Sequence, residues 1–145
     1  MTHRPTGRLV GAVVIAAALT SGCGISHTPL EVALGSATSA TGSAALAVRS
    51  FDDGALMSTV AATTIDDAVR EISTAAADAT TYRGSAGPER HLQEKSWPVL
   101  TRAIRHLHQA QDQLESPAKR PHLVKVLERD RDELEKLSTR AGEVG

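Results

Sequence analysis

Apolar residues recur every three or four positions through most of the chain beyond residue 55, which is the spacing of one face of an α-helix. The first regular stripe lies between residues 55 and 82, where most charged side chains fall outside the apolar positions. It consists of Ile65, Val69, Ile72, Ala76, Ala79 and Tyr82. We therefore expect a helix from Ala55 to Tyr82.

A second stripe follows the segment 83–88, where two glycines and a proline interrupt the pattern. It lies within 89–115 and consists of Trp97, Leu100, Ile104, Leu107, either Ala110 or Gln111, and Leu114. Pro98 falls inside this segment, where proline removes one backbone hydrogen bond. We expect a continuous helix kinked at Pro98. The alternative is a helix that begins near Pro98 after a short first turn.

The last stripe is the most regular one. It follows Ser116, Pro117 and Pro121, which separate it from the preceding helix. Its members are Leu123, either Val126 or Leu127, Asp130, Leu134, Leu137 and Ala141. Asp130 places a carboxylate in this apolar seam, and the pattern assigns it no role. Gly142 is expected to end the helix in the left-handed conformation.

The pattern is least regular between residues 30 and 51. Gly35 and Gly42 would each disfavour a helix interior by about 1 kcal/mol. The apolar residues of the segment nevertheless lie among alanines, at Val32, Leu46, Val48 and Phe51, so we expect a helix whose start is undefined. Asp52, Asp53 and Gly54 predict a turn, with the acids capping the next helix.

Four helices joined by short connections predict an all-α fold, an antiparallel up-down-up-down four-helix bundle over residues 30–145. The alternative is a three-helix bundle with a disordered N-terminal arm that reaches about residue 42. The chain has one tryptophan, one tyrosine and one phenylalanine, which argues against a β-sandwich. We interpret Trp97 as the one large side chain of an alanine-rich core. Alternatively, it is an exposed contact residue. Met57 is also interpreted as a core residue.

The start of the chain has the composition of a secretory signal. Arg4 and Arg8 precede the segment 9–20, which is apolar except for its last residue, and Gly22 leads into Cys23, the only cysteine. The apolar run is too short for a comfortable membrane span, which needs about 20 residues. A single cysteine also excludes a disulfide within the chain.

The tetrapeptide Thr20-Ser21-Gly22-Cys23 resembles the lipobox of bacterial lipoprotein precursors, which typically reads Leu-Ala-Gly-Cys. Gly22 and Cys23 match the motif, whereas Thr20 stands where leucine is usual. The resemblance implies that the Cys23 thiol receives a diacylglycerol and that the chain is cut between Gly22 and Cys23. It divides the chain into a signal peptide (1–22), a tether (23–29) and the helical domain (30–145). The alternatives are an uncleaved signal anchor and secretion with a free thiol.

Charge is distributed unevenly along the chain that this cleavage would leave. The removed segment holds two of the sixteen basic residues and no acid, so fourteen basic and seventeen acidic residues remain, a net charge of −3. Residues 23–82 carry −5 and residues 83–145 carry +2. Neither half has the basic excess typical of nucleic-acid binding. We interpret the asymmetry as two helical pairs with complementary rims.

The polar residues form no recognisable catalytic motif. His106 and His108 point in different directions on a helix, while His108 and Asp112 share a face and could supply two metal ligands. The Glu-x-x-His motif of di-iron bundles does not occur, and a haem pocket lacks aromatic lining. P-loops, dinucleotide fingerprints and nucleophile elbows are also missing. We expect no cofactor, no bound metal and no enzymatic activity.

These observations favour a lipid-anchored, non-enzymatic protein on the outer face of a bacterial cytoplasmic membrane. Its expected partners are the membrane, through the lipid, and another protein of the cell envelope. The alternative function is a helical bundle that carries a small apolar ligand or a lipid between its alanine-lined helices.

Overall fold

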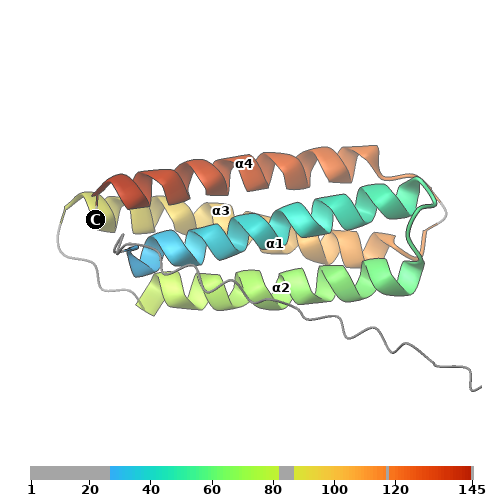
Figure 1. Ribbon diagram of the computed structural model, residues 1–145, viewed down its shortest axis with the longest axis horizontal. Coiled ribbons are helices and arrows are strands. Elements are labelled where there is room, and N and C mark those ends of the chain that lie inside the picture. The colour runs from blue at the N-terminus through green and yellow to red at the C-terminus, as the bar shows by residue number, and fades with distance from the viewer. Residues whose placement is uncertain (1–26, 82–86, 117, 145) are drawn as a thin grey trace, which may run out of the picture.

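The computed structural model describes residues 27–81, 87–116 and 118–144, which form four helices and no strand (Figure 1). The helices are α1 (Pro29–Asp52), α2 (Ser58–Thr81), α3 (Pro88–Gln113) and α4 (Pro121–Val144). Consecutive helices run in opposite directions, up, down, up and down. The predicted antiparallel four-helix bundle is confirmed.

The four helices form a bundle in which α1 and α3 lie across the shorter diagonal and α2 and α4 across the longer one. α1 packs against α2 and α4, and α3 packs against the same two helices, while α1 and α3 touch across the diagonal. The described residues of α2 and α4 make no contact with each other. These two helices each have 24 residues and run in the same direction. Because α2 and α4 do not touch, they lie at opposite corners of the bundle.

The segment with the weakest sequence pattern forms α1, which, like α3, touches all three other helices. The Thr28 side chain accepts a hydrogen bond from the Glu31 main-chain N–H (3.1 Å), and Pro29 occupies the first helical position. Apolar burial then follows a regular spacing of four and three residues along Leu30, Leu34, Ala37, Thr41, Ala44 and Val48. The three-helix alternative does not hold, because this segment is part of the core.

The same alternation of three and four residues runs through α2 and α4. The buried seam of α2 is Ala61, Ile65, Ala68, Ile72, Ala75 and Ala79. In α4 it is Leu123, Leu127, Asp130, Leu134, Leu137 and Ala141. This seven-residue repeat is typical of helices that pack with knobs into holes and coil around one another to the left. The stripe predicted for α4 is confirmed. In α2, Ile65, Ile72, Ala76 and Ala79 are buried as predicted, but Val69 is only half-buried and Ala68 takes its place in the seam. Tyr82 lies outside the described residues.

In α3 the core face differs from the predicted stripe. The buried positions are Leu92, Ser96, Val99, Leu100, Ala103, Leu107 and Ala110. Trp97 is 51% exposed, so its interpretation as a core residue is wrong. The neighbouring Ser96 and Leu100 face the core instead, and closely packed alanine-rich helices leave no room for an indole. Met57 is also no core residue, because it precedes α2 with 71% of its surface exposed.

The observed helix boundaries agree with the prediction for α3 and differ from it for α2 and α4. Pro98 lies inside α3, so the helix is continuous as predicted. Gly54 adopts a positive φ of 72° in the predicted turn, but α2 starts at Ser58 and Asp53 caps the end of α1. Gly142 does not end α4: the helix continues to Val144, and the φ of this glycine is not positive.

A buried arginine closes the end of the bundle where α1 ends and α4 begins. Arg120 donates to Asp52 from its guanidinium (Nη1 to Oδ1, 2.6 Å) and from its main-chain N–H (to Oδ2, 2.6 Å). Its Nε donates to the Gln113 carbonyl (2.6 Å), and its guanidinium lies 5.1 Å from the centre of the Phe51 ring. Asp52 therefore binds the connection before α4 rather than capping α2.

Candidate functional site

The proposed lipidation residue cannot be placed relative to the bundle. Gly22 and Cys23 lie outside the described residues, so the lipobox stays a prediction. No helix in the described ranges is both long and apolar enough to cross a membrane. α1 starts at Pro29, six residues after Cys23. We call the end of the bundle formed by Pro29, Thr81, Pro88 and Val144 the tether end.

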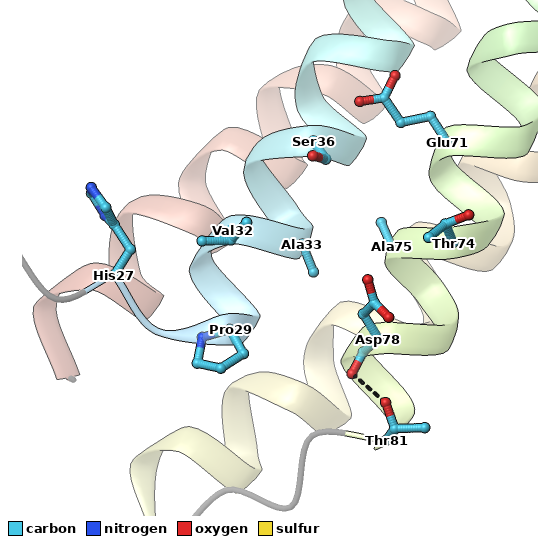
Figure 2. A pocket seen from close by; sticks show the side chains of 10 residues that line it. All are labelled: His27, Pro29, Val32, Ala33, Ser36, Glu71, Thr74, Ala75, Asp78 and Thr81. Carbon is cyan, nitrogen blue, oxygen red and sulfur yellow. Dashed lines mark hydrogen bonds between the residues drawn. The ribbon is translucent and has the colours of Figure 1, made fainter. Parts of the chain in front are cut away.

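An open groove runs between α1 and α2 at the tether end (Figure 2). Its volume is about 630 Å³. The lining residues come from the start of α1 and the second half of α2: His27, Pro29, Val32, Ala33, Ser36, Glu71, Thr74, Ala75, Asp78 and Thr81. The groove exists because small side chains, Ala33 and Ser36 on one helix and Ala75 on the other, line the space between them.

The groove combines an apolar wall with two carboxylates. Val32, on α1, is 56% exposed and supplies a large aliphatic side chain to the groove. Glu71 and Asp78 stand seven residues apart, so they share one face of α2 and both line the groove. Neither carboxylate has an ion-pair partner within the part of the chain that the structure describes. The groove is therefore suited to a cationic occupant.

A second polar feature lies between α3 and α4, around the aspartate that the sequence pattern could not explain. Asp130 is 1% exposed, and both of its carboxylate oxygens are bound by α3. Arg102 Nε donates to Oδ1 (2.7 Å) and His106 Nδ1 donates to Oδ2 (2.5 Å). Arg102 also donates to Glu133 (Nη2 to Oε2, 2.5 Å). The hydrogen bond to Glu133 and, to a smaller extent, the one to Asp130 raise the pKa of the Arg102 guanidinium.

This cluster has the geometry of a structural bridge between two helices. Two α3 side chains one helical turn apart hold a single α4 carboxylate, which fixes how far one helix can slide along the other. Among the described residues, no serine or threonine hydroxyl and no thiol hydrogen-bonds to His106.

The histidine pair considered for metal binding does not assemble into a site. His108 Nδ1 is hydrogen-bonded to Gln111 Oε1 (2.8 Å) rather than to Asp112. Gln111 in turn donates to Asp66 of α2. In the described ranges, no three histidine, cysteine, aspartate or glutamate side chains gather closely enough to hold a metal ion.

The exposed indole of Trp97 lies at the outer edge of the contact between α2 and α3, in the half of the bundle nearest the tether end. It borders a hollow of about 330 Å³ that is also lined by Ala79, Thr80, Gln93, Glu94 and Ser96. The Gln93 side chain donates to the Ala79 carbonyl (2.5 Å), which ties the start of α3 to the end of α2. Trp97 is thus an exposed aromatic residue on the surface, as the alternative interpretation of the sequence required.

Comparison with protein-family models, curated proteins and solved structures found no match for this chain. The candidate surfaces are therefore argued from its own residues. The sequence reasoning missed the groove carboxylates Glu71 and Asp78, although their seven-residue spacing on a helix was visible. It also missed Arg102 and Arg120, for which no local sequence signal exists.

Proposed function

We propose that this chain is a lipid-anchored, non-enzymatic interaction protein on the outer face of the cytoplasmic membrane, and that Trp97 contacts another envelope protein. The observation that carries the proposal is the exposure of the only tryptophan, which is 51% accessible in a bundle otherwise packed with alanine and leucine. Tryptophan is strongly enriched among the residues that dominate binding energy at protein interfaces.

The anchor is supported by the lipobox-like segment and by the short tether. A diacylglycerol on Cys23 brings two acyl chains, which hold a small domain at a bilayer far more firmly than one chain. Six residues from Cys23 to Pro29 span at most about 20 Å. The tether end of the bundle, with the groove and the half of α3 that carries Trp97, would then face the layer just above the lipid headgroups.

A carrier of a small apolar ligand is the second candidate. Its support is the volume of the groove, which falls within the range of about 300–1,000 Å³ of small-molecule sites. Glu71 and Asp78 weigh against it, because covering unpaired carboxylates with an apolar ligand costs free energy. Native mass spectrometry of the full Cys23→Ala chain tests it, since a carrier retains a reproducible bound mass.

The test of the leading proposal is a crosslinking pull-down of the full-length protein from its own membranes. Four forms are compared: wild type, Cys23→Ala, Trp97→Ala and Leu46→Ala. Leu46 is a matched control, because it is also an exposed apolar side chain (61%) but lies on α1. Wild type and Leu46→Ala should recover one partner, and Trp97→Ala should lose most of it, because interface tryptophans commonly contribute about 2 kcal/mol or more.

Fractionation of the same cells tests the anchor separately. Cys23→Ala should leave the membrane fraction while keeping its helical content. Retention of Cys23→Ala in the membrane would contradict lipidation, and equal partner recovery with Trp97→Ala would contradict the contact surface.

A further inference from the structure

The outer face of α4 carries cations in the same pattern as three carboxylates on one side of α2, two of which line the α1–α2 groove. Asp67, Glu71 and Asp78 are separated by four and then seven residues. On α4, Lys125, Arg129 and Lys136 are separated by four and then seven residues, and all three are exposed. Both spacings keep the three side chains on one side of their helix.

Neither row is fully neutralised within its own bundle. Lys125, Arg129 and Lys136 have no ion-pair partner in the described part of the chain. On α2, Asp67 pairs with the neighbouring Arg70, an exposed pair that contributes little to stability, while Glu71 and Asp78 have no described partner. The α4 face also bears Asp132, whose carboxylate is already bound by Arg131 (Nη2 to Oδ1, 2.6 Å).

The direction and length of the two helices make these rows compatible. α2 and α4 run the same way along the bundle and have the same length. Counted from the helix starts, the acidic row begins five residues later than the basic row, a difference of about 7.5 Å at 1.5 Å per residue. Because the spacings are identical, one displacement along the axis aligns all three pairs together.

We propose that the α4 face of one copy of this chain docks against the α1–α2 groove of a second copy, with Lys125, Arg129 and Lys136 opposite Asp67, Glu71 and Asp78. The apolar wall at Val32 would then be covered by the aliphatic stems of the basic side chains. The occupant of the groove is thus a second copy of the chain, selected by charge complementarity at a matched spacing.

This contact joins two different surfaces, so it does not close on itself in a dimer. Because α2 and α4 lie at opposite corners, one bundle can engage a neighbour on each side. Each neighbour is displaced by about 7.5 Å along the axis, so a tether of at most about 20 Å limits a row of parallel copies on one membrane to a few. The parallel arrangement rests on the proposed anchoring, since copies held by Cys23 on one membrane all point the same way. Confinement to the membrane also raises the effective concentration of one copy near another. A contact made of exposed ion pairs needs this increase, because each such pair contributes little binding free energy.

A photoreactive amino acid at Thr74 tests the contact directly. Thr74 is exposed and lies in the groove between the two unpaired carboxylates. Illumination of cells that make the full-length protein should give a crosslinked species of twice the chain mass, with the crosslink mapped to α4 of the second copy. The same amino acid at Thr101, an exposed position on α3, is the control and should give no such species.

Charge reversal then tests whether the two rows recognise each other. Glu71→Lys/Asp78→Lys and Arg129→Glu/Lys136→Glu should each reduce the crosslinked dimer roughly tenfold, because like charges then face each other. Co-expression of the two double variants should restore it, since each contact again joins opposite charges. Asp112→Lys/Glu115→Lys changes the net charge as much as the first variant, but on exposed residues in the last turn of α3 and just after it, and should leave the dimer unchanged.

Three results would overturn the proposal: no crosslinked dimer, a crosslink to a different protein, or no restoration on co-expression. Cell fractionation is measured in the same samples. A Cys23→Ala chain that stays in the membrane counts against the anchor, whereas an anchored chain without the crosslink counts only against self-association.

Discussion

At the scale of single residues, the side chains that matter most are polar ones whose partners lie on another helix. The stripe of α4 marked Asp130 as inward-facing, and it is indeed buried. Its partners Arg102 and His106 precede it by more than twenty residues, on α3. A periodic pattern shows which positions face inward, but it contains no information about which side chain of another helix reaches them.

Removal of the Asp130 carboxylate should destabilise the bundle. We expect Asp130→Ala to lower the free energy of unfolding by about 1–3 kcal/mol, because Arg102 and His106 lose the carboxylate that binds them and a cavity remains. Both partners are partly exposed and can regain water, which keeps the loss below that of a fully buried pair. Urea unfolding of the full Cys23→Ala chain, followed by circular dichroism, measures the change.

The neighbouring Asp132 provides the control for this measurement. Its carboxylate is exposed and binds only Arg131 on its own helix. Asp132→Ala should therefore change the unfolding free energy by less than about 0.5 kcal/mol. Equal effects of the two substitutions would contradict the assignment of Asp130 as the residue that bridges α3 and α4.

Trp97 illustrates a different limit of residue-level prediction. It lies at helical spacing from Leu100 and Leu107, so the pattern placed it in the core. A rotation of α3 by one position changes which residues face inward, and Ser96 occupies the buried position instead. Since the choice depends on the space left between alanine-lined helices, only the packed bundle reveals it.

At the scale of elements, α2 and α4 were predictable because both carry apolar residues at a regular spacing of three and four, interrupted in α4 only by Asp130. α1 was the uncertain element, since its core residues are mostly alanines and two glycines interrupt it. Both glycines face α4: a Cβ at Gly35 would meet Ser138, and one at Gly42 would meet the Arg131 side chain. Contacts with the other helices therefore outweigh the poor intrinsic helix propensity of this segment.

The same substitution at two glycines should have opposite effects. Gly35→Ala should raise the free energy of unfolding by about 1 kcal/mol, because alanine favours the helix and its Cβ meets only Ser138 Oγ at 3.7 Å. Gly54→Ala should lower it by about 1 kcal/mol, because the turn requires a positive φ of 72°. Thermal and urea unfolding of the two variants beside their parent give the signs. Destabilisation by Gly35→Ala would mean that α1 and α4 lie closer together than described.

At the scale of the whole molecule, the fold class followed from the sequence, whereas the surfaces did not. The uneven charge was interpreted as complementary rims within one bundle. The structure shows such a pair between Asp52 and Arg120, but Glu71 and Asp78 on α2 and the three basic residues of the α4 row have no described ion-pair partner. Such an arrangement depends on how helices are ordered around the bundle, which composition does not specify.

Self-association through these corners should depend strongly on salt. An increase from about 0.1 M to about 1 M NaCl shortens the Debye length from about 10 Å to about 3 Å. We expect the Thr74 crosslink in isolated membranes to fall roughly tenfold over this range, while helical content stays constant. A crosslink that survives 1 M salt would show that apolar contacts at Val32, rather than charges, hold the copies together.

The position of α1 has a mechanical consequence. If Cys23 is held in the bilayer, a pull on the protein enters the bundle at Pro29 and acts along the axis of α1. α1 is packed against all three other helices, so this load shears many contacts at once instead of peeling one helix away. Attachment through α2, whose described residues contact only α1 and α3, would load fewer of them. The chain is thus joined to its tether at the helix best able to bear tension.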